Sequence, residues 1–450
     1  MQAEPDLAPP RATPGWQRGL VWIAECPRAA WAVVAAAVAV RVGLVVARGD
    51  YAPYTSELQG VARTLAATGR IADAYGPGTG LTSHVGMVSP LLPAFAYWLF
   101  GEGVAAELFL TAVAAAVIGL TALACNAVFR RLGTPAAARG LAIALVVLVP
   151  LQAQLETVDL RARETALAAL GLATVIAICL KLDAGPRPLP WRWLALLSML
   201  CGVLFLLSPA AAVAAYAACG VMAVRCLPLR RWPATAAMAA ATVVLMSAPW
   251  ALRNQHVFGE TVLTRGNFGL EYALGTNAAA VDPVDPAATF RATLKAIHPY
   301  KSAAVRARMA AAGGEVAYSR QLGTATAAWV AAHPAEARRI WLRHAREFYL
   351  PPAWLWNPYA TPTPVQRWLA AGLIAATLAA FANLALRLWQ RRWDYLYVAL
   401  PLFTVMLPYA LLQPRLRYRY VITTLLVFLL FDLARRSFRP PTGPAAVGAR

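Results

Sequence analysis

Apolar residues lie in blocks of membrane-spanning length, and short polar segments separate the blocks. A helix needs about 20 apolar residues to cross roughly 30 Å of hydrocarbon. The pattern therefore predicts an all-α integral membrane protein of about ten transmembrane helices. The expected spans are residues 29–47, 104–129, 136–151, 164–181, 193–208, 210–225, 233–251, 365–386, 395–413 and 418–434.

Every second polar segment between these blocks is basic. Lys and Arg collect in cytoplasmic loops of membrane proteins, so both chain ends are expected in the cytoplasm and the other loops outside, in the periplasm of a bacterial inner membrane. The expected regions are a cytoplasmic tail (1–28), an N-terminal transmembrane region (29–252), a periplasmic segment (253–364), a C-terminal transmembrane region (365–434) and a second cytoplasmic tail (435–450).

Two of the outer segments are long. In the first, residues 48–103, the stretch Ser56–Thr68 has apolar residues at helical spacing and ends at Gly69, which predicts a helix lying at the membrane interface. The apolar run Val88–Phe100 is too short for a span and is expected to be re-entrant or interfacial. In the second outer segment, helices are expected at about 303–312, 315–331 and 335–349.

Composition supports a membrane protein and argues against other classes. The chain of 450 residues is 60% hydrophobic and 14% charged, whereas a soluble domain is about half apolar and a quarter charged. Its net charge of +20 lies mostly in short loops, so membrane orientation explains it better than nucleic-acid binding. The six cysteines are scattered and form no CxxC pair, which predicts neither a disulfide framework nor a zinc site.

Acidic residues are scarce, so their positions are informative. Asp50 and Glu57 directly follow the first span in a segment that faces outward. Each is either a solvated loop residue or a catalytic base, and Glu57 is the better candidate because it lies on the amphipathic helix. A second outer cluster contains Asp159, which we expect near a polar head group or a metal. Glu164 begins a span, where the helix dipole explains an acid.

Three arginines occupy one short loop that the topology places outside. They are Arg415, Arg417 and Arg419 in QPRLRYRY, residues 413–420. Arginine binds phosphate through bidentate, charge-assisted hydrogen bonds, so this loop is interpreted as part of a site for a lipid phosphate. Contact with anionic head groups without specificity, or a locally wrong orientation, are the alternatives.

Three further polar residues are weaker candidates. Arg253 follows a span in PWALRN, Arg63 lies on the first outer helix, and His84 lies in LTSHVGMVSP. His84 is interpreted either as a hydrogen-bonding residue of an acceptor pocket or as a structural histidine. Walker A, GxSxG and HExxH motifs are absent, so ATP-driven and serine-hydrolase mechanisms have no support.

Several segments in a fixed order resemble the GT-C superfamily of membrane glycosyltransferases. They are SELQGVARTLAATGRI, GPGTGLTSHVGMVSPLLPAFAYWLFG, PWALRNQHVFGETVLTRGNFGLEYALGTN, AIHPYKS, GEVAYSRQ, WVAAHPAEARR and the RYRY before the last span. Together they span most of the chain. The resemblance is to families 39 and 83, which include protein mannosyltransferases and the aminoarabinose or galacturonic acid transferases of lipid A.

The resemblance implies a hexosyl- or pentosyltransferase that uses a polyprenyl-phosphate sugar, such as an undecaprenyl-phosphate sugar, on the outer face. Better-known relatives often carry an Asp-Glu pair in the first outer loop, where this chain has Tyr54 and Thr55. Glu57 or Asp50 is then expected to be the base, and a divalent cation remains open. The expected substrate-binding residues are Arg63, His84, Asp159, Arg253, Arg415, Arg417, Tyr418 and Arg419.

The acceptor is expected to be an envelope lipid, protein or glycan. Two other classes remain open at this point. A transporter or flippase for a lipid or lipid-linked sugar would also need many spans, and a scaffold protein would need no chemistry.

Overall fold

The protein is described from a computed structural model that covers residues 14–52, 56–161, 163–356, 358–359 and 361–435. The described chain is all-α, with one isolated β-bridge between Ala72 and Leu81. This confirms the predicted fold class. Tyr54 and Thr55, where relatives carry an acidic pair, lie outside the described residues.

All ten predicted spans are helical. They correspond to α2 (Ala29–Arg48), α5 (Val104–Arg131), α6 (Ala136–Leu148), α8 (Thr165–Asp183), α9 (Trp191–Leu207), α10 (Pro209–Cys226), α11 (Trp232–Phe258), α17 (Pro364–Trp389), α18 (Leu396–Thr404) with α19 (Leu407–Leu411), and α20 (Leu416–Leu433). Among the described residues, seven helical segments are long and apolar enough to cross a membrane. An eighth span results if α6 is joined to the helical residues 153–161 across a 70° bend.

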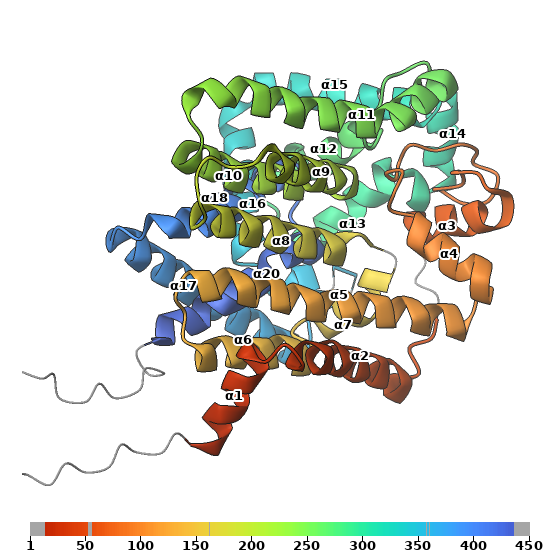
Figure 1. Cartoon of the computed structure of the whole chain (residues 1–450). Helices are drawn as coiled ribbons and strands as arrows, with labels where there is room; N and C mark the ends of the chain where they lie inside the picture. The colour runs from red at the N-terminus through yellow and green to blue at the C-terminus, as the bar shows by residue number, and fades with distance from the viewer. Residues whose placement is uncertain (1–13, 53–55, 162, 357, 360, 436–450) are drawn as a thin grey trace, which may run out of the picture.

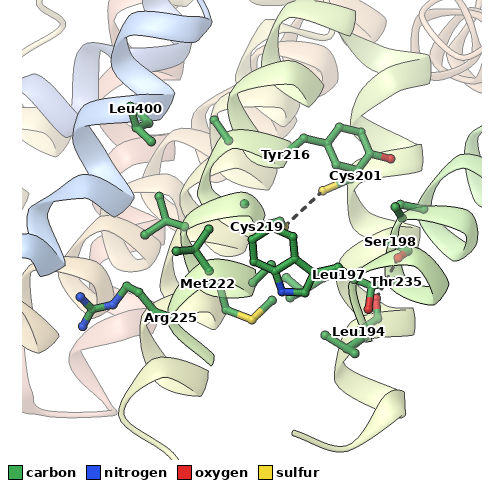
Figure 2. Close-up of a pocket in the computed structure, with 18 of the residues that line it drawn as sticks. Leu194, Leu197, Ser198, Cys201, Tyr216, Cys219, Met222, Arg225, Thr235 and Leu400 are labelled. Carbon is green, nitrogen blue, oxygen red and sulfur yellow. Dashed lines mark hydrogen bonds between the residues drawn. The ribbon is translucent and has the colours of Figure 1, made fainter. Parts of the chain in front are cut away.

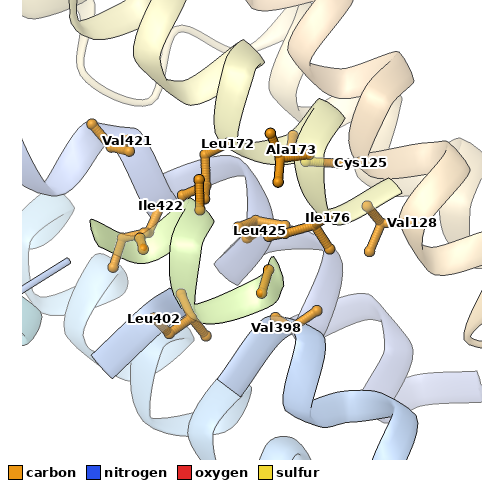
Figure 3. Packing of buried hydrophobic residues seen from close by; sticks show 14 of the residues in the cluster. Cys125, Val128, Leu172, Ala173, Ile176, Val398, Leu402, Val421, Ile422 and Leu425 are labelled. Carbon is orange, nitrogen blue, oxygen red and sulfur yellow. The ribbon is translucent and has the colours of Figure 1, made fainter. Parts of the chain in front are cut away.

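The core of the bundle is built from aliphatic and small side chains. Figure 3 shows side chains from α5, α8, α18 and α20 interdigitating there, among them Cys125, Ile176, Val398 and Leu425. Along α10 the buried positions are mostly alanines. Small residues allow helices to approach closely, and in a membrane such packing replaces the hydrophobic effect as the force between helices.

One helix precedes the first span, where the sequence had suggested only a tail. This is α1 (Gly15–Glu25), which packs on α6. The contact requires a glycine, because a Cβ added at Gly140 would lie 2.0 Å from the carbonyl oxygen of Leu20. The adjacent Arg139 forms an ion pair with Glu25, so the N-terminal helix is anchored by both packing and charge.

At the same end of the bundle, a buried carboxylate ties several elements together. Asp432, near the end of α20, is fully buried. Its two oxygens accept hydrogen bonds from Thr134, Asn383, Arg387, Tyr395 and Arg435. Because a charge inside a membrane protein must be paired or solvated, this network fixes α17 and α20 against the loop that follows α5.

The predicted amphipathic helix is confirmed as α3 (Glu57–Thr68). Ser56 caps it, accepting a hydrogen bond from the Gln59 amide at 3.3 Å, and Gly69 ends it with a left-handed φ of 70°. The short apolar run forms α4 (Leu91–Phe100), which packs between α3 and α5. In Figure 1, α3 and α4 lie at the end of the bundle away from α1.

The second outer segment contains the three helices predicted for it and two that were not predicted, α12 (Phe268–Gly275) and α13 (Pro286–Ile297). The predicted helices are α14 (Ala303–Ala311), α15 (Glu315–Ala332) and α16 (Pro334–Tyr349). Figure 1 shows α13 and α14 beside α3 and α4, so the two outer segments meet at one end of the bundle.

Glycines of α12 allow two close approaches. A Cβ at Gly269 would lie 1.9 Å from the carbonyl oxygen of Ser319 on α15. A Cβ at Gly275 would lie 1.8 Å from the carbonyl oxygen of Leu412, just before the arginine loop. The outer helices are thereby pressed against the segment that leads into α20.

Candidate active site

A polar cavity lies where the two outer segments meet the arginine loop. Its volume is about 130 Å³. Its wall combines residues of α3, α12 and α13 with residues that flank α8 and α20. The acidic, basic and histidine residues that line it are Glu57, His84, Arg163, Glu164, Arg265, Glu271, His298, Arg415 and Arg417.

Glu57, His84 and His298 form a compact cluster on one side of this cavity. One ligand atom from each lies within 4.8 Å of the other two, and Glu57 Oε1 is 3.9 Å from His298 Nε2. Glu57 is the first residue of α3, His84 lies in the loop after it, and His298 ends α13. Two imidazoles and a carboxylate are a ligand set that suits zinc, iron and related divalent ions.

The pKa values of Glu57 and His84 favour a carboxylate and a neutral imidazole, the forms that bind a cation or accept a proton. Burial lowers the pKa of His84 from 6.5 to about 3, so its imidazole is neutral at neutral pH. Burial alone would raise the pKa of Glu57, but the interactions of its carboxylate with its surroundings, including the charge of Arg163, outweigh that effect and lower it. The hydroxyl of Tyr75 lies 3.0 Å from His84 Nδ1, which orients the ring and directs Nε2 away from Tyr75.

The loop that carries His84 is held from the second outer segment. Glu315, the first residue of α15, accepts hydrogen bonds from the Thr82 hydroxyl at 2.7 Å and the Ser83 hydroxyl at 2.9 Å. Arg253 donates to the Thr82 carbonyl at 2.9 Å. Arg253 therefore positions this loop, and it does not line the cavity.

The helix that carries Glu57 is held by a chain of buried side chains. Gln59 donates to the Tyr97 hydroxyl at 3.0 Å, and Tyr97 donates to Glu107 at 3.1 Å. Arg161 bridges Glu107 at 3.3 Å and the backbone carbonyl of Asp50 at 2.8 Å. Such a supporting shell keeps the carboxylate of Glu57 in one place.

Arginines form the opposite side of the cavity. Arg417 Nη2 donates to the Tyr418 hydroxyl at 2.8 Å, and Arg265 forms an ion pair with Glu164. The guanidinium of Arg415 lies 4.5 Å from the centre of the Phe290 ring. Its Nη1 is buried and has no hydrogen-bond partner within the described part of the chain. A buried donor without a partner is costly, so this nitrogen is well placed to bind an anionic ligand.

The polar cavity continues into an apolar one. The second cavity has a volume of about 350 Å³ and shares Arg265, Arg417 and Tyr418 with the first. It also shares Arg163, Glu164, Asn267, Glu271 and Gln413 with the first. The part of its wall that is not shared is mostly apolar and includes Leu207, Pro209, Ala210, Pro408, Leu412 and Val421. A charged chamber joined to an apolar one fits an amphiphile with an anionic head and a hydrocarbon chain.

The structure brings together five of the predicted site residues and separates the others. Glu57, His84, Arg415, Arg417 and Tyr418 line the polar cavity. Asp159 lies close enough to feel the charges of Arg415 and Arg417, but it is not part of the lining. Asp50, Arg63, Arg253 and Arg419 lie elsewhere.

Two of the separated arginines have clear structural partners. Arg63 forms a 2.8 Å ion pair with Glu102 near the surface. Arg419 is buried and donates to Thr377 on α17 at 2.6 Å, so it joins two helices of the bundle.

Sequence reasoning missed several cavity residues, chiefly His298, Arg163, Arg265 and Glu271. His298 lies within AIHPYKS, but no spacing along the chain relates it to Glu57 or His84. Arg265 lies in the Gly/Asn-rich segment before α12, and only its ion pair with Glu164 reveals its place. These residues are joined by tertiary structure, so periodicity carries no signal for them.

The buried neutral His84 predicts a pH dependence of stability. Its pKa is about 3 when folded and 6.5 when exposed, so between these values the unfolded chain binds the extra proton and the free energy of unfolding falls as the pH is lowered. The midpoint of thermal unfolding of the purified protein should therefore drop below about pH 6.5. His84→Asn should flatten this drop, whereas the same change at the exposed His333 should not. Identical pH profiles for both variants would contradict this assignment.

No protein-family model matches this chain, and no curated protein matches it in sequence. Solved structures do resemble it. The apo form of the oligosaccharyltransferase of Archaeoglobus fulgidus aligns with a TM-score of 0.51 at 14% identity, over 94% of this chain and 50% of that one. The same organism's oligosaccharyltransferase AglB, in complex with an inhibitory peptide and a dolichol-phosphate, aligns with a TM-score of 0.48 at 13% identity over the same shares.

A third solved structure is ArnT from Cupriavidus metallidurans bound to undecaprenyl phosphate. Its TM-score is 0.35 at 16% identity, over 92% of this chain and 78% of that one. The chain thus spans about half the length of the oligosaccharyltransferases it resembles. The likeness to the apo oligosaccharyltransferase shows a common fold.

Proposed function

Starting from the GT-C fold predicted from the sequence and shown by that likeness, we propose that this protein is a glycosyltransferase of the bacterial inner membrane. It moves a sugar from a polyprenyl-phosphate donor to an envelope acceptor on the periplasmic face. The observation that supports this most is the joined pair of cavities, which places Glu57 and the arginines in one polar chamber beside an apolar one.

The two cavities match the two parts of such a donor. Arg415 and Arg417 bind the phosphate, with charge-assisted hydrogen bonds that a guanidinium makes well. The apolar walls near Pro209 and Pro408 accept the first isoprene units of the lipid. The sugar then lies between the arginines and the cluster of Glu57, His84 and His298.

The reaction proposed is a single displacement with inversion at the anomeric carbon. The acceptor oxygen or nitrogen attacks this carbon, and Glu57 accepts its proton as general base. The bond between the anomeric carbon and the phosphate oxygen breaks, and its electron pair remains on the phosphate. Arg415 and Arg417 stabilise the negative charge that develops on this leaving group. A divalent cation held by Glu57, His84 and His298 would supply Lewis-acid chemistry at the acceptor.

Transport of a lipid or a lipid-linked sugar is the alternative function. Charged residues buried within the spans would support it, because such residues often mark a transport pathway. Arg41 and Glu156 form a fully buried 2.6 Å ion pair. However, Arg41 also donates to the carbonyls of Val146 and Val147, at the end of α6 where the helix breaks. Arg41 therefore supplies hydrogen bonds to carbonyls that lose their helical partners where α6 ends, which gives the ion pair a structural role. No specific observation then supports transport.

The proposal predicts that the donor accumulates when the enzyme is lost. A deletion strain should contain several-fold more of one polyprenyl-phosphate sugar than its parent, measured by mass spectrometry of lipid extracts, because transfer consumes this lipid. Expression of the wild-type gene should restore the parental level. An unchanged set of lipid-linked sugars under conditions of expression would contradict the proposal, and the mass of an accumulating lipid would identify the sugar.

A further inference from the structure

A second large cavity lies far from the candidate active site, in the face of the bundle formed by α9, α10, α11 and α18. Its volume is about 720 Å³, within the range of ligand-sized cavities. The wall is almost entirely apolar, with Leu197, Met222, Ala236 and Leu400 among its residues. Figure 2 shows Arg225 at one end of this groove and Tyr216 towards the other.

The groove belongs to the opposite half of the membrane from the active site. Pro209, at the start of α10, lines the apolar cavity of the active site, whereas Arg225, at the end of α10, lines the groove. At 1.5 Å per residue these positions lie about 24 Å apart along the helix. The hydrocarbon layer is roughly 30 Å thick, so the groove lies in the cytoplasmic leaflet of the proposed topology.

The loops beside the mouth of the groove are strongly basic. They connect α8 to α9 and α10 to α11. Together with the adjoining helix ends they carry Lys181, Arg187, Arg192, Arg225, Arg230 and Arg231 against the single acid Asp183. Two tryptophans, Trp232 and Trp393, line the groove near these basic residues. Tryptophan is enriched where a membrane meets water.

Part of this positive charge has no protein partner. Asp183 pairs with Arg187 and Arg225, and Lys181 and Arg231 lie over tryptophan rings. Arg192 and Arg230 are exposed, and neither forms an ion pair or a side-chain hydrogen bond with another described residue. The positive-inside rule explains basic loops in general, but it does not explain an adjoining groove of lipid size.

We propose that this groove binds an anionic glycerophospholipid of the cytoplasmic leaflet. An acyl chain lies between α10 and α11, and the phosphate lies beside Arg225 and the basic loops. Basic pockets between transmembrane helices on the cytoplasmic side are typical sites for anionic lipids. This binding is independent of the proposed transfer reaction, which takes place at the other end of the bundle.

A glycine in the wall allows a clean test. A Cβ at Gly220 would meet no atom within 4 Å, so Gly220→Leu fills the groove without a clash, and leucine favours the helix more than glycine does. Gly372 on α17 is equally open but lies outside the groove, so Gly372→Leu is the matched control. Arg192→Gln with Arg230→Gln removes the unpaired charges and leaves the groove open.

The experiment compares binding of dioleoyl-phosphatidylglycerol and dioleoyl-phosphatidylcholine to the purified full chain, by native mass spectrometry and thermal unfolding. The wild type and Gly372→Leu should prefer phosphatidylglycerol by about fivefold or more, since each arginine near an anionic surface contributes a factor of about five. Gly220→Leu should lose the bound lipid, and the double arginine variant should lose only the preference.

Equal binding of the two lipids to the wild type would overturn the proposal, because it would indicate ordinary surrounding lipid. Retention of phosphatidylglycerol by Gly220→Leu would overturn it as well. A changed oligomeric state of Gly220→Leu with unchanged lipid binding would show that a second copy of the chain occupies the groove instead. If Gly220→Leu does not fold, the double arginine variant decides, because an unchanged preference there excludes the proposed phosphate site.

Discussion

Replacing Glu57 by glutamine should reduce sugar transfer about 10²- to 10⁴-fold, the usual contribution of a general base. The amide has the shape of the carboxylate but cannot accept a proton, and it is a poorer metal ligand. The arginine side of the cavity is untouched, so binding of polyprenyl phosphate should persist. The rate is measured in membrane vesicles with the donor lipid that accumulates in the deletion strain.

A second acid of the same outer segment provides the control. Glu102 is exposed and pairs with Arg63, and such surface pairs contribute about 0–1 kcal/mol to stability. Glu102→Gln should therefore leave the transfer rate unchanged. Full activity of Glu57→Gln, with Glu102→Gln equally active, would remove Glu57 from the chemistry.

Replacing Arg417 by alanine should weaken binding of undecaprenyl phosphate by about 30-fold or more, because loss of one partner from a buried charge pair costs about 2–5 kcal/mol. Arg417 lines both cavities, so it lies where the head group meets the lipid chain. Arg417→Lys should restore binding only in part, since an ammonium cannot make the bidentate contact. Affinity is measured by titration of the purified protein in detergent.

Substitutions of two other arginines serve as controls that distinguish the loss of the Arg417 contact from a general loss of positive charge. Arg367 is exposed at the start of α17, and Arg367→Ala should bind the lipid as the wild type does. Arg419 is buried against α17, so Arg419→Met should lower thermal stability and leave the affinity of the folded fraction unchanged. Equal loss of affinity in Arg417→Ala and Arg367→Ala would indicate that only net charge matters.

The pattern of apolar residues was sufficient to predict the helices. All ten segments predicted as spans are helical, and the amphipathic helix after Ser56 and the three helices after residue 302 are present, because each is specified by local periodicity and caps. The short N-terminal helix α1 was missed, since a polar, Pro-rich start concealed it. Its position depends on Gly140, far along the chain.

The arginine loop shows how an element boundary decides the role of a residue. The sequence suggested one cluster of three arginines, with the span starting at residue 418. The helix begins at Leu416 instead, and consecutive residues turn by about 100°. Arg417 and Arg419 are therefore on nearly opposite faces, one towards the cavity and the other towards α17.

The acidic and histidine side of the site could be predicted only in part. Glu57 was recognisable because few acids follow the first span, and the helix it begins was clear. The sequence left Glu57 and Asp50 as alternatives, and the fold places Glu57 in the cavity and holds the Asp50 carbonyl against Arg161, which favours Glu57 in the proposed role. The partnership with His298 arises only when α13 packs near α3.

The proposed transfer is tested most directly by comparing the envelope glycans of the parent, the deletion strain and a strain with Glu57→Gln, by mass spectrometry. We expect one glycan or glycolipid species to lose the mass of a single sugar in both mutant strains, and the wild-type gene to restore it. An unchanged glycan profile in the deletion strain, under conditions in which the gene is expressed, would contradict the assignment of this protein as a glycosyltransferase.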